Sequence, residues 1–216
     1  MSALKNKIIA EFFGTALLLA IVTGSGIMGE SLSSGNAAVA LLGNSIATGC
    51  GLYALITLLG PISGAHFNPV VSLMFWQKGT MSIHELPSYV VAQITGAICG
   101  VWLTHLMFHL PILQLSNKPR NGLGIWVSEL AATFILLSVI HLGVKYAQEK
   151  IPMLVALTVT AGYWFTSSTF FANPAVTLAR SLTNTFVGIA PADVFGFIVV
   201  QLLALAAFLI LFKSQK

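Results

Sequence analysis

Two short stretches decide the fold, SGAHFNPVV at residues 63–71 and FFANPAVTL at residues 170–178, and each is built around the pair Asn-Pro. Asn is favoured as the residue that caps the start of a helix, and Pro fits the first helical turn because the N–H that it lacks would be unpaired there. The apolar runs that begin at these pairs, Pro69 to Trp76 and Pro174 to Ala179, are shorter than the roughly 20 residues that a helix needs to cross a bilayer. Each stretch therefore predicts a helix that enters the membrane without crossing it, a re-entrant half-helix.

The composition around these stretches is that of a membrane protein. Of the 216 residues, 56% are hydrophobic and 7% are charged, and the mean hydropathy is +0.90, whereas soluble domains carry about 25% charged residues. A water-soluble fold is excluded on this ground, and residues 1–216 are expected to form a single all-α membrane domain. Six segments are apolar and long enough to cross the bilayer: Ile8 to Met28, Ala37 to Leu59, Tyr89 to Phe108, Ile125 to Tyr146, Met153 to Thr169 and Val194 to Phe212.

The chain also repeats itself, beyond the two Asn-Pro stretches. Ala10 to Thr15 in the first span resembles Ser128 to Thr133 in the fourth, and Tyr89 to Gln93 in the third span resembles Phe197 to Gln201 in the sixth. Three matches in the same order indicate a duplication, with one copy in residues 1–115 and the other in residues 116–216. Because each copy holds three spans, the second must insert upside down relative to the first, which predicts an inverted repeat with a shared site at the membrane midplane.

The basic residues predict the orientation. If the N-terminus lies in the cytoplasm, the outer loops hold only Lys118 and Arg120, and Arg180 belongs to a half-helix and is not counted. The positive-inside rule then places both termini in the cytoplasm and the protein in the inner cell membrane. Seven lysines fall on the inner side: Lys5, Lys7, Lys78, Lys145, Lys150, Lys213 and Lys216.

Several other classes of protein are disfavoured. The net charge of +4 and the pI of about 9.2 do not indicate nucleic-acid binding, because the basic residues are scattered. Cys50 and Cys99 lie in apolar spans without metal or redox spacing, so they are expected to be small buried hydrophobes. No pairing of a nucleophile with a base and no metal-binding motif occurs, so we expect neither an enzyme nor a metal nor a cofactor.

The Asn-Pro pairs suggest a mechanism. If both half-helices reach the bilayer centre, their starts meet there with the positive ends of the helix dipoles facing a pore, which opposes cations and protons. An amide suits that position, because its oxygen can cap the helix while its NH2 donates hydrogen bonds to a passing solute. Asn68 and Asn173 are therefore the expected midplane residues of a pore for uncharged solutes.

With these motifs the chain resembles the aquaporin family along its whole length. The resemblance is carried by Ser63 to Val70, by Asn173-Pro174-Ala175, and by the motifs around Glu11 and Glu129. It implies six spans plus two half-helices, an inverted repeat, and a homotetramer in the lipid bilayer with one pore for water and small neutral solutes in each subunit.

The resemblance also implies a role for two acids that are expected to be buried. Glu11 and Glu129 are costly within a membrane, which favours a defined role, and in this family such acids accept hydrogen bonds from the re-entrant loops; a proton relay is the alternative. His66 either lines the inner pore or supports its loop, and both interpretations stay open.

The resemblance further places a narrow filter near the outer mouth, at Thr48, Ala161, Phe170 and Val176. The fourth position is normally Arg, and its replacement by Val176 should widen the opening and remove a charge. An Arg follows at Arg180, where seven residues of about 100° each bring it back to within roughly 20° of the Asn173 face. Arg180 could line the outer vestibule, or it could reach the surface or tie down a loop.

These features predict a passive channel for small uncharged solutes. The stretch from Asn173 to Arg180, preceded by Tyr163 to Thr166, is similar to the bacterial aquaporin branch associated with arsenic detoxification, so neutral metalloid hydroxides such as arsenous acid are the leading substrates, with glycerol-like solutes and water. A channel for water or ammonia without a metalloid role is the alternative. A secondary transporter could also use an inverted repeat, but it would need an ionisable coupling pair at the midplane.

Overall fold

The structure is a computed structural model, and it describes residues 3–213. All regular structure in that range is helical, in an order that matches the sequence prediction: long and short helices alternate in the same way in each half of the chain. The elements are α1 (Ala3–Leu32), α2 (Ala37–Ser63), α3 (Pro69–Gln77), α4 (Leu86–Met107), α5 (Leu123–Tyr146), the 3-10 turn η1 (Gln148–Lys150), α6 (Ile151–Phe165), α7 (Pro174–Arg180) and α8 (Pro191–Leu211).

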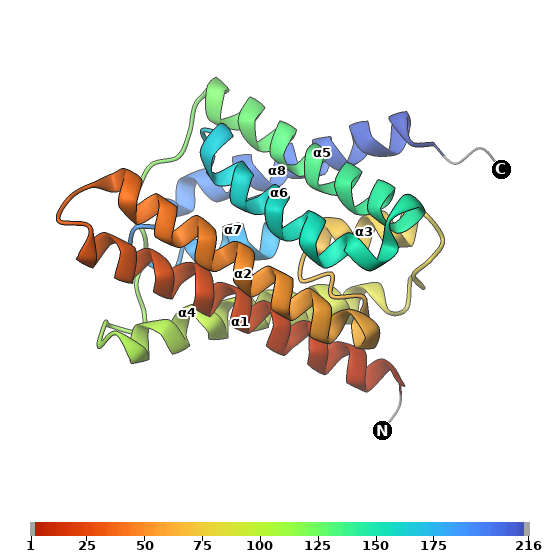
Figure 1. Cartoon of the computed structure of the whole chain (residues 1–216), viewed down its shortest axis with the longest axis horizontal. Coiled ribbons are helices and arrows are strands. Elements are labelled where there is room, and N and C mark those ends of the chain that lie inside the picture. Colours follow the sequence, from red (N-terminus) through yellow and green to blue (C-terminus); the bar gives the residue numbers. More distant parts are fainter. Residues whose placement is uncertain (1–2, 214–216) are drawn as a thin grey trace.

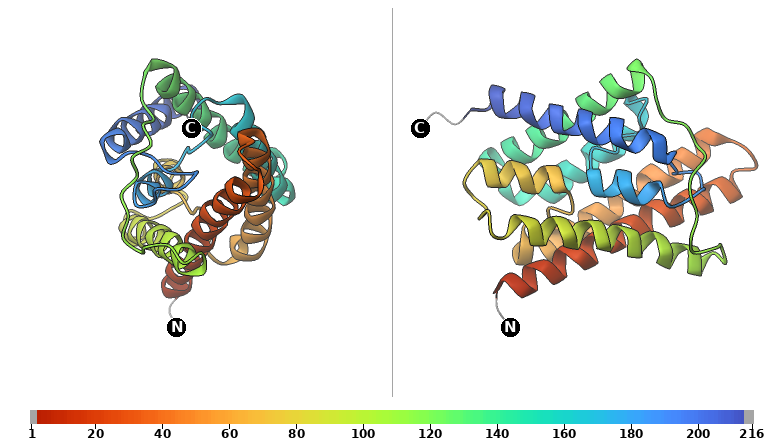
Figure 2. Two further views of the ribbon diagram at one scale, coloured as in Figure 1. Left: turned by 90° about the vertical axis from the view of Figure 1, so that its left-hand side faces the viewer. Right: turned by 180° about the vertical axis from the view of Figure 1, so that it is seen from behind.

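The two short helices lie inside a ring of six long ones. Figure 1 shows α3 and α7 in the middle of the molecule, and Figure 2 shows them nearly in line, one following the other. Helices α1, α2 and α4 pack together on one side, and α5, α6 and α8 form the other. The half-helices begin at Pro69 and Pro174, as the sequence predicts, so the chain places two helix starts at its centre.

The two ends of the chain lie on the same side of the molecule. Helix α1 begins and α8 finishes at the right of Figure 1. We call this the inner end and the opposite side the outer end. Lys216, one of the lysines expected on the inner side, lies outside the described residues.

Within residues 3–213, five helices are long and apolar enough to cross a membrane: α1, α2, α4, α5 and α8. The sixth, α6, has 15 residues, which corresponds to about 22 Å, less than the roughly 30 Å hydrocarbon core. The predicted fifth span, Met153 to Thr169, is therefore helical only as far as Phe165. Its last residues, from Thr166 onward, are non-helical and lead into the second Asn-Pro loop.

Glycines allow α1 and α4 to approach closely. A Cβ added at Gly96 would overlap the carbonyl of Phe12, and one added at Gly100 would overlap the carbonyl of Ala16. Small residues four positions apart are the usual way for membrane helices to come into backbone contact. This contact fixes α1, which carries Glu11, against α4, which carries Gln93.

The cysteine prediction was wrong. Cys50 on α2 and Cys99 on α4 are both exposed on the outer surfaces of their helices. A membrane protein has apolar residues outside as well as inside, so apolar surroundings in the sequence did not indicate burial.

Candidate functional site

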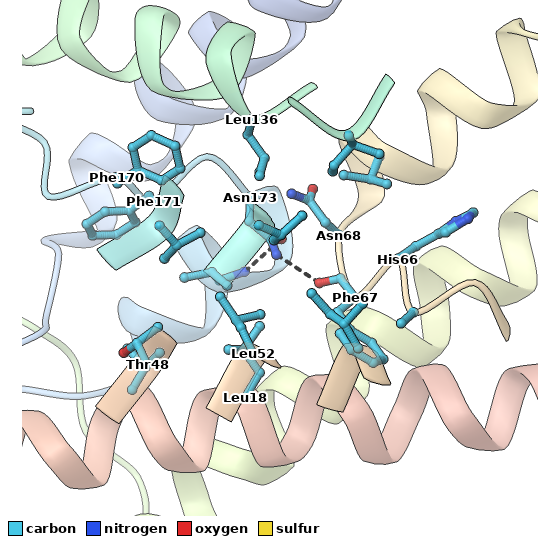
Figure 3. A pocket seen from close by; sticks show the side chains of 18 of the residues that line it. Leu18, Thr48, Leu52, His66, Phe67, Asn68, Leu136, Phe170, Phe171 and Asn173 are labelled. Carbon is cyan, nitrogen blue, oxygen red and sulfur yellow. Dashed lines mark hydrogen bonds between the residues drawn. The ribbon is translucent and has the colours of Figure 1, made fainter. Parts of the chain in front are cut away.

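A cavity lies between the two halves of the chain, and the long helices line it with regular stripes (Figure 3). Residues four apart lie on the same face of a helix, and four helices each present such a face to the cavity. The stripes are Leu18 and Val22 on α1, Thr48, Leu52 and Ile56 on α2, Leu136, Ile140 and Val144 on α5, and Ile151, Val155, Val159 and Tyr163 on α6. Most of the wall is therefore aliphatic.

The two Asn side chains lie at the centre of the cavity and are tied to each other's loops. Each caps its own half-helix: Asn68 Oδ1 accepts from the N–H of Val70 at 3.0 Å, and Asn173 Oδ1 accepts from that of Ala175 at 3.0 Å. The amide nitrogens cross over: Asn68 Nδ2 donates to the carbonyl of Ala172 at 2.7 Å. Asn173 Nδ2 donates to that of Phe67 at 2.8 Å, and Figure 3 shows this second bond. Within residues 3–213 each NH2 has that one acceptor, so its second hydrogen is available to a molecule in the cavity.

The loops that precede the half-helices share an unusual backbone. The same three positions before each Asn have positive φ, and five of the six residues are not glycine, a conformation that costs of order 1–3 kcal/mol each. Non-helical backbone at membrane depth is tolerated where it is buried or lines a cavity. The residues are Gly64 (φ 87), Ala65 (φ 50) and Phe67 (φ 49) in the first loop, and Thr169 (φ 60), Phe170 (φ 55) and Ala172 (φ 47) in the second.

Glu11 holds the first loop. Its carboxylate accepts hydrogen bonds from the backbone N–H groups of His66 (2.9 Å) and Phe67 (2.7 Å), from Ser63 Oγ (2.7 Å) and from Gln93 Nε2 (2.8 Å). The side chain is fully buried and does not line the cavity. This geometry favours the structural role over a proton relay.

Glu129 occupies the equivalent place in the second half with fewer partners. It accepts from the backbone N–H of Ala172 and from Gln201 Nε2, the latter at 2.8 Å. Gln201 also donates to Thr177 Oγ1 at 2.9 Å, just as Gln93 donates to Ser72 Oγ at 3.0 Å in the first half. Glu129 likewise does not line the cavity.

His66 both lines the cavity and packs against its neighbours, so the two interpretations that the sequence left open are compatible. It lines the cavity at the inner end, and its ring is held by neighbours. Nδ1 lies 3.0 Å from Ser72 Oγ, the ring stacks on Phe75 with centroids 4.6 Å apart, and the Tyr89 ring lies at 5.3 Å.

Three of the four expected filter residues line the cavity near its outer end: Thr48, Phe170 and Val176. The fourth, Ala161, is a correction, because it is exposed on the other side of α6. Tyr163 takes its place, with its hydroxyl 3.2 Å from Thr48 Oγ1. Two residues turn a helix by about 200°, so Ala161 and Tyr163 point in nearly opposite directions. The stripe from Ile151 through Val155 and Val159 was the signal that leads to Tyr163.

Arg180 faces the cavity and also ties down a loop. It is 2% exposed, lines the cavity beyond Val176, and donates from Nε to the carbonyl of Val187 at 2.5 Å. Its guanidinium carbon lies 3.5 Å from the centroid of the Phe171 ring. The alternative that Arg180 extends to the outer surface is therefore wrong.

Residues 3–213 contain no group of three or more His, Cys, Asp or Glu that could hold a metal ion. The ionisable side chains that reach the cavity are His66, Tyr163 and Arg180. They lie at its two ends and not beside Asn68 and Asn173.

Comparison with known proteins identifies relatives across the chain. Residues 1–167 match the family model described as Major intrinsic protein. Aquaglyceroporin AqpS of Rhizobium meliloti (strain 1021) is 50% identical over 210 residues, which is 97% of this chain and 90% of that protein. Aquaporin NIP1-1 of Zea mays is 35% identical over 161 residues, 72% of this chain and 55% of the plant protein, so the match spans just over half the length of that relative.

A solved structure agrees with the architecture. The X-ray structure of the aquaglyceroporin from Plasmodium falciparum superimposes with a TM-score of 0.76 over 97% of this chain and 93% of that one, at 24% identity. At that identity the likeness concerns the fold alone. It confirms the predicted fold class, an all-α membrane protein with two half-helices inside a ring of long helices.

Proposed function

Because the chain belongs to the major intrinsic protein family, it is a multi-pass membrane channel and not an enzyme, and we propose that its solutes include glycerol-like polyols and neutral metalloid hydroxides such as arsenous acid. Water and small neutral solutes are the substrates that family membership supports directly. The relative AqpS is named an aquaglyceroporin, which supports polyol passage.

The observation that carries the proposal is the chemistry of the constriction. Thr48 and Tyr163 place two hydroxyl groups together, and Phe170 and Val176 present apolar surface to the same part of the cavity. No charge is present among these four residues. A solute that has hydroxyls on one side and an apolar remainder on the other fits such a wall, because each polar group finds a partner and no apolar surface is left against water.

Asn68 and Asn173 provide further hydrogen-bond donors for such a solute at the centre of the cavity. Each offers one free N–H to a passing hydroxyl, between walls of Leu and Val. Arsenous acid is uncharged and carries three hydroxyls, so it can accept hydrogen bonds from the same amide groups as glycerol does. The alternative, a channel for water or ammonia alone, would need an opening too narrow for polyols. A secondary transporter finds no coupling pair, since no ionisable lining residue lies beside the two Asn.

The proposal is tested by permeability in proteoliposomes to water, glycerol and arsenous acid, measured side by side. Val176→Arg should lower glycerol and arsenous acid permeability about tenfold or more, because the longer cationic side chain fills the opening, while water permeability falls less. Val176→Leu, which adds volume without charge, is the matched control and should act more weakly. Unchanged passage of glycerol through Val176→Arg would refute the assignment of the constriction.

The remaining parts of the proposal concern assembly and orientation. We propose a homotetramer in the inner cell membrane, with the inner end of the structure in the cytoplasm and with residues 1–115 and 116–216 as the two inverted copies. The basic residues and the shared side of the two chain ends support this orientation. Labelling of Lys5→Cys in sealed cells, in a chain that also carries Cys50→Ser and Cys99→Ser, tests it, because labelling by an impermeant reagent from outside would exclude it.

A further inference from the structure

Two arginines contact one aromatic ring at the outer end of the cavity. Arg180 ends α7, and Arg120 belongs to the loop that precedes α5. Their guanidinium carbons lie 3.5 Å and 5.2 Å from the centroid of Phe171. We call these three residues the arginine vestibule. Arg180 and Phe171 line the cavity itself, while Arg120 lies behind them.

The hydrogen bonds of both guanidinium groups go to neutral oxygen atoms. Arg180 Nε donates to the carbonyl of Val187, and Arg120 Nε donates to that of Gly188 at 2.8 Å. Arg120 Nη1 has one further contact, 3.5 Å from Thr169 Oγ1. For Arg180, within residues 3–213, the Nε bond is the only hydrogen bond of the side chain, so its four Nη hydrogens have no acceptor there.

No carboxylate of residues 3–213 forms an ion pair with either arginine, although the buried Glu129 attracts both of them at longer range. The ion pairs among residues 3–213 are Lys7 with Glu85 and Lys118 with Glu30, so neither arginine takes part in one. Two acids nearby in the fold bind other donors and not the guanidinium groups. Asp193 accepts from the backbone N–H of Arg120 at 2.7 Å and from Asn121. Glu129 accepts from Ala172 and Gln201 through Oε1, and its Oε2 has no hydrogen-bond partner among the described residues.

Arg180 is almost fully buried and Arg120 is partly buried, and burial of a cation without an ion-pair partner is costly. The Phe171 ring offsets part of this cost, since an aromatic face contributes about 0.5–2 kcal/mol to a cation above it. An anion from solution would offset more, and the free Nη groups of Arg180 provide the geometry for one. Guanidinium binds planar oxyanions through two parallel hydrogen bonds and is itself weakly hydrated.

We propose that the arginine vestibule is a binding site for a small monovalent anion from the outer solution. The Nη groups of Arg180 hold the anion by hydrogen bonds, and the positive charge of Arg120 adds to the attraction. The site concerns binding alone and does not depend on which neutral solute the channel passes. A weakly hydrated, planar anion such as nitrate fits it best, whereas gluconate is too large to enter beside Arg180.

Thermal unfolding of the purified protein in detergent tests the site without any transport measurement. Sodium gluconate is replaced stepwise by sodium nitrate at constant ionic strength. A ligand that binds only the folded state raises Tm with its concentration, and we expect a saturating rise of about 2–5 °C in the wild type. No nitrate-dependent rise in the wild type overturns the proposal.

Three variants locate the effect. Arg180→Leu should abolish the nitrate shift, and Arg120→Leu should reduce it, which keeps a test available if Arg180→Leu does not fold. Lys118→Met is the matched control, because Lys118 is a cation of the same loop as Arg120 but is paired with Glu30 at 3.7 Å and is partly exposed; it should keep the full shift. A full nitrate shift in Arg180→Leu, or in a folded Arg120→Leu when Arg180→Leu does not fold, places the anion elsewhere and overturns the proposal.

Discussion

The inner and outer mouths of this channel share one backbone arrangement but carry different side chains at equivalent positions. Two residues before each Asn stands a ring, His66 inside and Phe171 outside, and seven residues after each Asn stands the residue that stacks on it, Phe75 inside and Arg180 outside. In the inner mouth the nitrogen-bearing group precedes the half-helix, whereas in the outer mouth the cation follows it.

The difference shows which parts of the repeat are under structural constraint. The loop dihedral angles, the crossed Asn bonds and the Glu–Gln pairs recur in both halves because the buried backbone donors must be satisfied in each. The side chains that face the cavity carry no such requirement. They diverge, so the inner mouth presents backbone at Gly64 and Ala65 beside His66, and the outer mouth presents Phe170, Phe171 and Arg180.

The largest effect should come from the acids that hold the two loops. Glu11→Leu leaves two backbone N–H groups, a serine hydroxyl and the Gln93 amide without their acceptor, at about 1–3 kcal/mol for each buried donor, so we expect a severe loss of Tm or failure to fold. Glu129→Leu strands fewer donors and should cost less. Thermal melting of the two variants in detergent compares them directly. A greater loss of Tm for Glu129→Leu would show that the number of hydrogen bonds does not predict how much each acid stabilises the protein.

A moderate effect should follow at the corrected filter position. Tyr163→Phe removes the hydroxyl beside Thr48 and should lower glycerol permeability a few-fold relative to water, because the polyol loses one hydrogen-bond partner of about 1 kcal/mol. Ala161→Phe, on the opposite face of α6, is the control and should leave both permeabilities unchanged. Stopped-flow light scattering of proteoliposomes measures the ratio; a response to Ala161→Phe alone would restore the original assignment.

The smallest effect should appear at the rims. Lys7 and Glu85 form an ion pair of 2.9 Å at the inner end, with side chains 37% and 24% exposed, so Lys7→Met should cost only about 0.2–1 kcal/mol. The hydrogen bond from Lys7 lowers the pKa of Glu85. This contribution is complete above the unfolded-state pKa of about 4.3 and is lost as the pH falls through the lower folded-state pKa.

Melting curves at several pH values measure the rim effect. The difference in Tm between the wild type and Lys7→Met should be constant from pH 7 to about pH 5 and should shrink only in stronger acid. A difference that disappears already near pH 6 would mean that another group is responsible. Lys118→Met, which removes the longer ion pair of 3.7 Å at the outer end, is the comparison and should lower the stability still less.

Most of the architecture could be predicted because it follows from local rules. Asn-Pro starts a helix, apolar length predicts a span, and three spans in each copy imply inversion. The errors concerned the end of α6, the direction in which Ala161 points, and the burial of Cys50 and Cys99. Apolar length alone did not show that α6 ends at Phe165, where the chain enters a loop in which Thr169 and Phe170 have left-handed backbone angles. Ala161 lies within α6, and the period of the helix turns it away from the face that carries Tyr163.

The role of Arg180 needed the tertiary structure. Helical periodicity placed it on the side of the cavity, but its partners Val187 and Phe171 come from two different loops, and no local pattern indicates that they converge. The same holds for Arg120. The sequence did place Thr48, Phe170 and Val176 at the cavity, where they lie in the structure. Thr48 and Val176 lie within α2 and α7, and Phe170 lies three residues before Asn173.

The crossed amide bonds impose an order on biosynthesis. The carbonyl of Phe67 receives its donor from Asn173, and the amide of Asn68 finds its acceptor at Ala172. When the first half of the chain has left the ribosome, its loop therefore still lacks a partner from the half that is not yet made. The two loops can form these bonds only once both are present, so we expect them to reach their final conformation together.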